Sequence, residues 1–389
     1  MVESRSTSKQ GRRIRLGMVG GGEGAFIGAV HRIAARLDDH YELVAGALSS
    51  TPRKSLQSAQ ALGLDRERGY PDFETMAKAE AGREDGIEAV SIVTPNHAHF
   101  AAASAFLKRG IHIICDKPMT TTLADAKKLA KLVERSGLVF CLTHNYTGYP
   151  MIRHARAMIG AGELGTIRVV QVEYPQDWLT EKLEDTGQKQ AAWRTDPKRS
   201  GAGGCVGDIG THAFNLAAFT TGLRCEELCA DLSTFVAGRR LDDNVQMLLR
   251  YKGGARGMLW ASQVAPGNEN NLKLRVYGTK GGLGWHQEQP NHLHVAPFGQ
   301  PPRLISRGTG AANAAANRVT RIPAGHPEGY LEGFATVYSE AAAAIIAART
   351  SAKPAPEVIF PTVQDGVDGV AFIEAAVASS VKGGRWVKL

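Results

Sequence analysis

Lys117 occupies a position where a side chain able to do chemistry is expected. It lies in the tripeptide Asp116-Lys117-Pro118, directly after Ile111–Cys115, a short apolar run that predicts a buried strand. Doubly wound folds bind ligands at the carboxyl ends of their strands, so this lysine is predicted to face a ligand. Pro118 cannot donate to a sheet ladder; it therefore ends the strand and helps to fix the direction of Lys117. For the tripeptide alone, a surface lysine at a strand end is the plainer alternative.

Asp208 and His212 form a second candidate group, with the spacing Asp-x-x-x-His. If Asp208 opens a helix, as aspartate favours, the two side chains share one helix face. A carboxylate beside an imidazole can orient the ring and raise its basicity, which suits a proton acceptor working near neutral pH. Together with Lys117 and a nucleotide-binding loop, the pair predicts a hydride-transfer site.

A glycine-rich turn separates a predicted strand, Arg13–Val19, from a predicted helix that begins at Ala29. Strand, glycine-rich turn and helix are the context of a dinucleotide fingerprint. Glycines let the backbone approach a pyrophosphate, and the helix N-terminus offers free N–H groups. Gly20 and Gly22 fit the first two positions, whereas the close-packing glycine is delayed to Gly28, so the turn carries about three extra residues relative to the fingerprint. A generic flexible loop is the alternative.

The second predicted strand, Tyr41–Leu48, ends without the Asp or Glu that would bind the ribose hydroxyls of NAD. Ser49 and Ser50 follow it, and Arg53 and Lys54 come shortly afterwards. Hydroxyls with cations could hold a 2′-phosphate, but serines also bond to ribose. The cofactor is therefore expected to be NAD or NADP.

Strands continue to alternate with helices up to about residue 146. Ala89–Val93 and Leu138–Leu142 read as further strands, and Phe100–Lys108 and residues 123–136 as helices. This alternation predicts a parallel sheet with right-handed crossovers.

At this point the chain resembles the glucose–fructose oxidoreductase, inositol dehydrogenase and MocA (Gfo/Idh/MocA) oxidoreductases over nearly everything after about residue 13. The resemblance rests on an ordered set of motifs: the glycine-rich turn, Thr94-Pro95-Asn96, Asp116-Lys117-Pro118 in place of the usual Glu-Lys-Pro, Asn145, Trp193-Arg194, residues 207–212, and the pattern at residues 277–282.

The resemblance implies an α/β protein with an N-terminal Rossmann domain at 14–146, after a disordered tail at 1–13. A substrate-binding and oligomerisation domain at 147–389 would be built on a large, mostly antiparallel open sheet, and its last helix could pack back on the first domain. The substrate would be a sugar, glycoside or cyclitol, with Lys117, Asp208 and His212 as the catalytic trio. His212 would take the hydroxyl proton, Lys117 would stabilise the charge on the same oxygen, and Asp208 would hold His212 or a neighbouring hydroxyl.

The wider site follows from the same motifs. The candidate cofactor-binding residues are Gly20, Gly22, Gly24, Phe26, Ile27, Ser49, Ser50, Arg53, Thr94, Pro95, Asn96, His99, Asp116, Lys117 and Asn145. The candidate substrate-binding residues are Lys117, Tyr149, Trp193, Arg194, Asp208, His212, His326 and Tyr330. For Trp193, ordinary core packing is the alternative.

Composition bounds the remaining possibilities. The 389 residues allow two domains with sizeable cores. About half of the net charge of +8 falls in residues 1–15, so no nucleic acid is expected as a partner. Arg12-Arg13 imitates an export signal, but the apolar stretch after it is the first Rossmann strand, which favours a cytoplasmic protein; no membrane span is expected.

Five cysteines without a C-x-x-C pair suit a reducing compartment. His292-x-His294 and His97-x-His99 lack a supporting Cys or carboxylate cluster, so no metal is expected.

The second domain is expected to contain strands near residues 167–174, 227–237, 244–251, 255–263 and 271–277, and helices at 329–349 and 362–380. Residues 299–320 read as a long loop. An open sheet with an uncovered face predicts a homodimer or homotetramer.

Two other functions stay open beside an NAD(P)-dependent dehydrogenase. One is a hydrolase or lyase that retains its nicotinamide and oxidises the sugar only transiently. The other is a non-catalytic nucleotide-binding regulator, against which the presence of Lys117, Asp208 and His212 counts.

Overall fold

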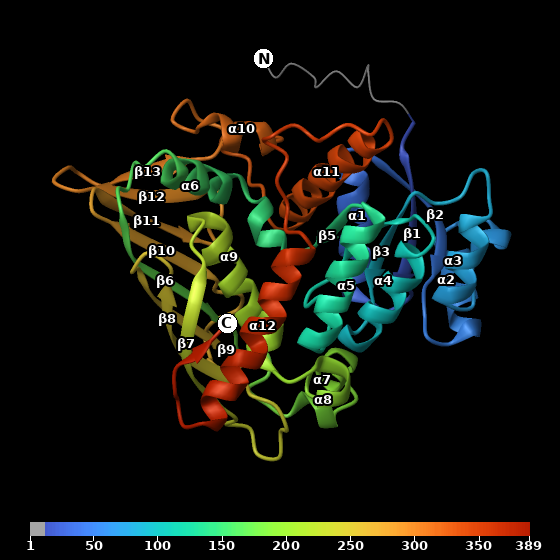
Figure 1. Cartoon of the computed structure of the whole chain (residues 1–389), viewed down its shortest axis with the longest axis horizontal. Coiled ribbons are helices and arrows are strands. Elements are labelled where there is room, and N and C mark those ends of the chain that lie inside the picture. Colours follow the sequence, from blue (N-terminus) through green and yellow to red (C-terminus); the bar gives the residue numbers. More distant parts are fainter. Residues whose placement is uncertain (1–11) are drawn as a thin grey trace.

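Two sheets organise residues 12–389, the part of the chain that this computed structural model describes (Figure 1). The first is a five-stranded parallel sheet of order β2-β1-β3-β4-β5. Its strands are β1 (Ile14–Gly20), β2 (Tyr41–Ala47), β3 (Ala89–Val93), β4 (His112–Cys115) and β5 (Phe140–Leu142). The helices between them are α1 (Phe26–Leu37), α2 (Pro52–Ala61), α3 (Phe73–Ala81), α4 (His99–Leu107) and α5 (Leu123–Ser136). The predicted Rossmann sheet is confirmed.

The central strand β3 is buried at every position, as expected for a parallel strand covered on both faces. All five strands run in the same direction, so their carboxyl ends share one edge of the sheet. The residues after β1, β3, β4 and β5 therefore gather there, and Lys117 is among them.

Helix α1 begins three residues earlier than predicted, at Phe26 rather than Ala29. Gly28 consequently lies in its first turn, where a Cβ would come within 2.3 Å of the Gly21 Cα. The extra residues of the turn are accommodated before the helix, and Gly28 still allows the helix to pack closely on the glycine-rich turn.

Only the end of the predicted tail lies within the described residues. Arg12 pairs with Glu88 and Arg13 with Asp39. The predicted disorder at 1–13 therefore does not extend to these two residues, and residues 1–11 lie outside the description.

The second sheet has nine strands in the order β13-β12-β11-β10-β6-β9-β8-β7-β14 and is antiparallel except between β6 and β9. The strands are β6 (Ile167–Pro175), β7 (Cys225–Ser233), β8 (Asn244–Tyr251), β9 (Arg256–Ser262), β10 (Lys273–Gly278), β11 (Gly281–His286), β12 (His292–Pro297), β13 (Arg303–Ser306) and β14 (Val387–Lys388). Its helices are α6 (Pro150–Gly160), α7 (Lys189–Arg194), α8 (Pro197–Ser200), α9 (Thr211–Thr221) and α10 (Ala314–Val319). The expected large, mostly antiparallel sheet is confirmed.

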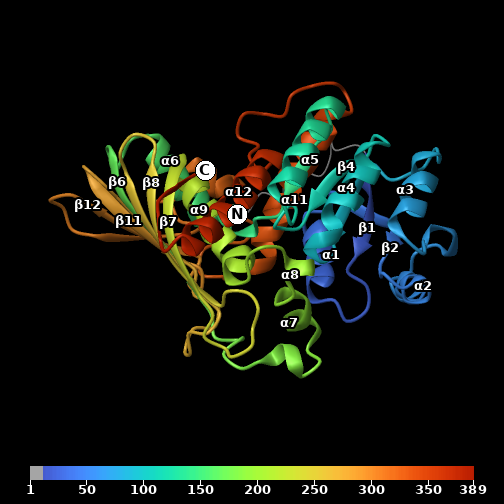
Figure 2. The same ribbon diagram turned by 60° about the horizontal axis from the view of Figure 1, so that its bottom comes forward.

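One face of this sheet is covered and the other is open. Along β8, Val245, Met247 and Leu249 are buried in the core, whereas Leu248 between them is 49% exposed. Figure 2 shows α9 and α12 on the side of the sheet that faces the first domain. The alternation therefore follows from helices covering a single face.

The predicted loop at 299–320 contains structure. β13 pairs with β12 at the edge of the sheet. α10 follows, and the Asn313 side chain caps it by accepting from Ala316 N at 3.1 Å. The cap residue before an alanine-rich stretch is a helix signal that the composition of the segment obscured.

Two C-terminal helices pack on the first domain. α11 (Tyr330–Ala348) buries Phe334, Val337 and Tyr338 against Ile14 and Leu16 of β1. The prediction assigned this helix to the second domain, but in the structure it forms part of the Rossmann core. α12 (Val363–Val381) lies between the domains and contacts both α5 and β7.

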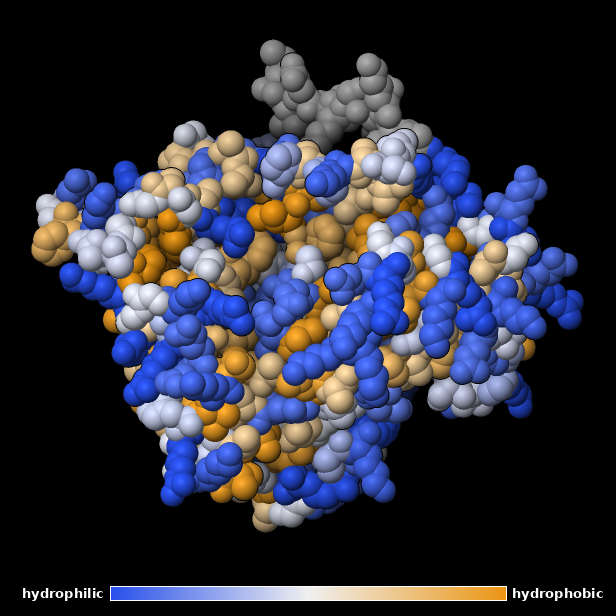
Figure 3. All heavy atoms as spheres, in the orientation of Figure 1, coloured by the Kyte–Doolittle hydropathy of each residue, from blue (hydrophilic) through white to orange (hydrophobic). Residues whose placement is uncertain are grey.

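Within residues 12–389, α11 is the one helix long and apolar enough to cross a membrane, and most of it is buried as a core helix. Figure 3 shows polar side chains spread over the face seen in Figure 1, with apolar ones scattered among them.

Candidate active site

Lys117 and Asp208 join the two domains at the carboxyl edge of the Rossmann sheet. Lys117 follows β4, and its Nζ donates to the Asp208 main-chain oxygen at 2.6 Å and to Asp208 Oδ1 at 2.9 Å. Both side chains are nearly buried, 12% and 13% exposed. An ammonium group has three N–H donors, so one remains for a ligand.

Asp208 has further donors on its other oxygen. Oδ2 accepts from Arg194 Nε at 3.1 Å and from Gln263 Nε2 at 2.9 Å. Burial would raise the pKa of Asp208, but the positive charges of Arg194 and Lys117 outweigh burial and hold that pKa well below its usual range. Asp208 is therefore an anion that balances two cations.

The predicted pairing of Asp208 with His212 is wrong in this structure. Residues Val206–Gly210 form a single π-helical turn, and α9 begins only at Thr211. The Asp208 carboxylate bonds Lys117, Arg194 and Gln263, because charges delivered by other segments prevail over the local i,i+4 spacing.

His212 has a different partner. Its Nδ1 lies 3.4 Å from Nδ1 of His144, which follows β5, and the two rings meet edge-on. Burial, and then the charge of Lys117, lower the pKa of His212 well below its ordinary value. The ring is neutral at physiological pH, which is the form able to accept a proton.

A scaffold of hydrogen bonds holds the Lys117 turn. Asp116 Oδ1 accepts from the Lys117 N–H at 2.9 Å and from Thr143 Oγ1 at 3.0 Å. His99 was predicted to contact the cofactor. Both of its ring nitrogens instead meet main-chain oxygens at 2.8 Å, of Pro118 and of Thr94. His99 therefore braces two turns and has no ring nitrogen left for a ligand.

Asn96 was also predicted at the cofactor. Its Nδ2 donates to Ser200 O at 2.9 Å, in α8 of the second domain. Pro95 precedes it as the residue before a short 3₁₀ turn. In this structure the Asn96 side chain is a contact between domains.

The glycine-rich turn fits a nucleotide phosphate. Gly20 and Gly24 have positive φ values of 78° and 73°, and a Cβ on Gly24 would point into open space. No side chain caps α1, so the first N–H groups of the helix, at Phe26 and Ile27, have no capping acceptor. Gly22 differs, because a Cβ there would lie 2.6 Å from Leu48 O.

Two buried polar atoms near this edge lack a partner within the described chain. They are Thr94 Oγ1, beside Gly20, and Nδ2 of Asn145 after β5. Buried polar groups without partners are rare in proteins. Together with the uncapped helix they fit a bound dinucleotide.

The predicted cofactor-binding residues after β2 make few contacts with the rest of the described chain. Ser49 Oγ accepts from Thr51 N at 3.3 Å, and both Ser50 and Arg53 are exposed.

Trp193 and Arg194 lie beside the Lys117–Asp208 pair on α7. The Arg194 guanidinium stacks over the Trp193 ring at 4.3 Å and near Trp178 at 5.9 Å. Its Nη1 donates to Gln190 Oε1 at 2.6 Å, so Arg194 is largely occupied by protein partners. Tyr330, the first residue of α11, lies close enough for the charges of Asp116 and Arg194 to influence its pKa, which burial raises.

Two predicted substrate contacts are not brought to this cluster. The Tyr149 ring is 1% exposed, stacks on Tyr146, and its hydroxyl accepts from Gln287 at 3.5 Å. It is a core residue because the start of α6 turns it inward. His326 is exposed before α11, and its main-chain oxygen accepts a hydrogen bond from Arg307 Nη2.

Three residues that contact His212 were not predicted, namely His144, Tyr146 and Tyr174, and neither was Gln263, which bonds to Asp208. Tyr146 and Tyr174 place their rings against His212 and share a hydrogen bond through their hydroxyls, with Asn270 beside them. His144 lies two residues after β5, as Lys117 does after β4, and Gln263 directly follows β9. Applying the strand-end rule to every predicted strand would have found His144, whereas the predicted strand 255–263 included Gln263.

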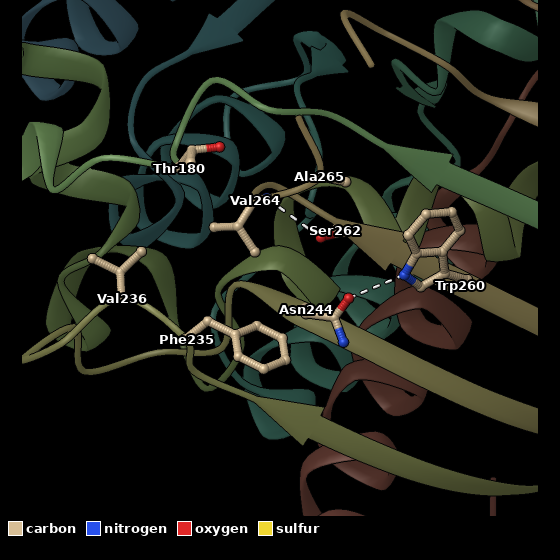
Figure 4. A pocket seen from close by; sticks show the side chains of 8 residues that line it. All are labelled: Thr180, Phe235, Val236, Asn244, Trp260, Ser262, Val264 and Ala265. Carbon is tan, nitrogen blue, oxygen red and sulfur yellow. Dashed lines mark hydrogen bonds between the residues drawn. The ribbon is translucent and has the colours of Figure 1, made fainter. Parts of the chain in front are cut away.

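Two surface hollows lie away from this cluster. One is lined by Thr180, Phe235, Val236, Asn244, Trp260, Ser262, Val264 and Ala265, and in Figure 4 Trp260 donates to Asn244. Successive side chains in a strand point to opposite faces of a sheet. Gln263 faces Asp208, so Trp260 and Ser262 point to the other face, and this hollow lies on the open face of the sheet. The other extends over the same face from β10 through β6, β9 and β8 to β7. In residues 12–389, no three His, Cys, Asp or Glu side chains could together hold a metal ion.

A Rossmann sheet with a nucleotide-ready turn, and a cation and a neutral imidazole at its carboxyl edge, define a nicotinamide-dependent oxidoreductase. The profile described as "Oxidoreductase family, NAD-binding Rossmann fold" matches residues 14–144, and that of the GFO/IDH/MocA C-terminal domain matches residues 152–284. The chain belongs to the Gfo/Idh/MocA oxidoreductase family, which confirms the predicted resemblance.

Three relatives illustrate the similarity. The uncharacterized oxidoreductase YfiI of Bacillus subtilis is 34% identical over 96% of each chain. The crystal structure of an oxidoreductase from Sinorhizobium meliloti is 59% identical, covers 97% of this chain and 100% of its own, and has a TM-score of 0.88. An inositol dehydrogenase homolog from Azotobacter vinelandii, solved with NAD⁺, is 37% identical over 98% of each chain with a TM-score of 0.93. The same homolog was also solved with NADH and myo-inositol.

Proposed function

We propose that this enzyme oxidises a ring carbinol of a sugar, glycoside or cyclitol and transfers the hydride to NAD or NADP. The observation that carries the proposal is the convergence of Lys117 from the first domain and His212 from the second around Asp208 and His144. A polyol ligand in the Azotobacter homolog supports the substrate class.

The glycine-rich turn and the first turn of α1 would hold the pyrophosphate, and Asn145 and Thr94 would hold the part of the cofactor nearer the reaction. Both have a buried polar atom without a partner in the described chain. When bound, the nicotinamide accepts the hydride. The protein residues supply position and electrostatic field.

His212 removes the hydroxyl proton. No described residue hydrogen bonds to its Nε2, so that nitrogen is free to accept. The remaining N–H of Lys117 donates to the same substrate oxygen and stabilises the negative charge that develops there. Asp208 keeps Lys117 in place and, because it is held ionised, balances the charges of Lys117 and Arg194.

The neighbouring aromatic residues would form the sugar site. Trp193 offers an apolar wall, and Tyr330 adds a hydroxyl at the start of α11. Arg194 would act mainly through Asp208, because its Nε is bonded to that carboxylate.

Activity on a substrate panel tests this proposal. Purified enzyme is supplied with NAD⁺ or NADP⁺ and with inositols, aldoses and anhydrosugars, and reduced cofactor is followed by absorbance. We expect net reduced cofactor with at least one polyol. Lys117→Met and His212→Asn should each lower kcat by roughly 100-fold or more with a smaller change in cofactor Kd. Near-normal turnover in both variants would reject these roles.

The same panel separates the retained-cofactor alternative, which would convert glycosides without net NADH. Location in the cytoplasm and assembly into a homodimer or homotetramer remain predictions, the second of which is tested below.

A further inference from the structure

His144 is a buried histidine to which the mechanism above assigns no step. It follows β5, is 2% exposed, and places its Nδ1 3.4 Å from Nδ1 of His212. In a hydrogen bond between two imidazoles, one nitrogen supplies the proton and the other the lone pair. The tautomer of one ring therefore fixes the tautomer of the other.

Other neighbours of His212 are already occupied. Oδ1 of Asp208 accepts from Lys117, and Oδ2 accepts from two further donors. The hydroxyls of Tyr146 and Tyr174 bond to each other and to Asn270, and only their rings contact His212. Among the described residues, His144 is the one hydrogen-bond partner of the His212 ring.

We propose that His144 is the positioning residue of the base: its Nδ1 lone pair accepts the Nδ1–H of His212 and thereby leaves the lone pair of His212 on Nε2. The inference rests on the proposed function for its catalytic meaning. During the reaction the substrate proton binds Nε2, and the Nδ1–H of His212 stays bonded to His144. No proton moves onto His144, so it fills the place that a carboxylate often takes beside a catalytic histidine.

The charges around the pair suit a neutral acceptor. Lys117, Asp208, Tyr146 and Tyr174 face His212, and Lys117 and Asp116 influence His144. Burial, and then the charge of Lys117, lower the pKa of His144 to about 3. A ring that stays neutral keeps a lone pair with which to accept.

Two substitutions distinguish positioning from other roles. In His144→Asn the side-chain oxygen occupies nearly the place of Nδ1 and can accept a hydrogen bond, but it cannot take up a proton. His144→Leu has similar bulk and cannot accept. Thermal unfolding of both variants establishes that they are folded.

The first readout does not depend on activity. Proton–nitrogen correlation spectra of ¹⁵N-labelled histidine rings report the tautomer of His212. The His212 signals are those missing from the spectrum of His212→Asn. We expect Nδ1–H in the wild type and in His144→Asn, and a shift toward Nε2–H in His144→Leu. A wild-type His212 that carries its proton on Nε2 would overturn the proposal.

The second readout is the pH profile of kcat and kcat/KM. We expect His144→Leu to lower kcat roughly 10- to 100-fold with unchanged cofactor Kd, and to shift the acid limb of the profile. The kcat of His144→Asn should be at least about tenfold higher than that of His144→Leu. If both variants lose kcat equally and the pH profile does not shift, His144 has only a structural role. If both lose kcat equally and the profile does shift, His144 acts as a proton relay. Either outcome would overturn the proposal. Inactivity of the wild type on every polyol, with the Nδ1–H tautomer present, would reject the proposed function alone.

Discussion

Lys117 and Asp208 meet twice, through the Asp208 main-chain oxygen at 2.6 Å and through Oδ1 at 2.9 Å. The two residues belong to different domains and are 91 positions apart in sequence. A contact through the main chain orients the lysine even when the carboxylate changes, whereas the carboxylate supplies the charge. Substitution at Asp208 therefore separates orientation from charge balance.

We predict that Asp208→Asn lowers both turnover and stability. The change leaves Lys117 and Arg194 without their shared anion in a nearly buried site, which costs about 3 kcal/mol. Turnover should fall by roughly 100-fold. Urea unfolding and steady-state kinetics measure the two effects, and Asp185→Asn, at an exposed pair with Lys182, is the control expected to change neither. Unchanged unfolding of Asp208→Asn would contradict the charge balance described here.

Mild acid should destabilise the protein through its buried histidines. Burial lowers the pKa of His31 to about 4, and burial together with Lys117 lowers that of His144 to about 3. The unfolded rings titrate near their ordinary value of about 6.5, so below that pH the unfolded state binds more protons. Their stabilising effect is complete above about pH 6.5 and is lost as pH falls toward 4, by up to about 1.4 kcal/mol per pH unit and ring.

Denaturant unfolding at pH 7.5, 6 and 5 measures this loss. The pKa of Asp208 is lowered in the fold, and its unfolded carboxyl titrates at about 3.9, so the stability that it contributes is lost only below about pH 5 and does not affect this slope. His31→Phe should flatten the pH dependence, and the exposed His326→Asn should not. A stability that stays constant from pH 7.5 to 5 would disprove the prediction.

Gly24→Ala should weaken cofactor binding while the fold is retained. The positive φ of Gly24 costs an alanine about 1 kcal/mol, and the added methyl enters the open space of the turn. Gly110→Ala is a matched control, with φ of 78° and open space at a turn outside the site. Calorimetric titration with NAD⁺ should give a higher Kd for the first variant only.

Gly22, the position first expected to approach the phosphate, is a poorer test. A methyl there would meet Leu48 O and the Ser58 side chain, so it would disturb the packing of the turn itself. Equal affinities of Gly24→Ala and wild type would show that the phosphate lies elsewhere.

The open face of the nine-stranded sheet is predicted to bind a second copy of the chain. Leu248 is 49% and Met258 44% exposed there, side by side on paired strands. A charge at that place should oppose burial between subunits. Met258→Glu is expected to yield monomers by light scattering after size exclusion, and Leu56→Glu, on an exposed part of α2, should not. Identical masses for Met258→Glu and wild type would exclude this face as the interface.

Local rules predicted the first domain well because its signals lie close together in sequence. Lys117 was predicted from its place after an apolar strand, and Gly28 from the glycine-rich stretch between a strand and a helix, although its spacing departs from the plain fingerprint. These inferences depend only on a parallel sheet collecting strand ends at one edge.

The candidate site was less predictable where its contacts span distant segments. The i,i+4 rule paired Asp208 with His212, but Arg194 and Gln263 are 14 and 55 residues from Asp208 and reach it through the tertiary fold. Similarly, Tyr149 and the helix α11 carry apolar patterns that indicate burial without identifying the core they join. An apolar pattern in the sequence shows which face of a helix is buried, whereas the element that this face packs against depends on the topology of the whole chain.

The placement of α11 has a consequence for biosynthesis. Ile14 and Leu16 are synthesised long before the helix that covers them, which spans Tyr330–Ala348. The nucleotide-binding half therefore cannot finish its core before α11 has been synthesised, and a fragment terminated at residue 146 would display an uncovered apolar sheet. We expect the two halves to fold as one cooperative unit rather than as two successive modules.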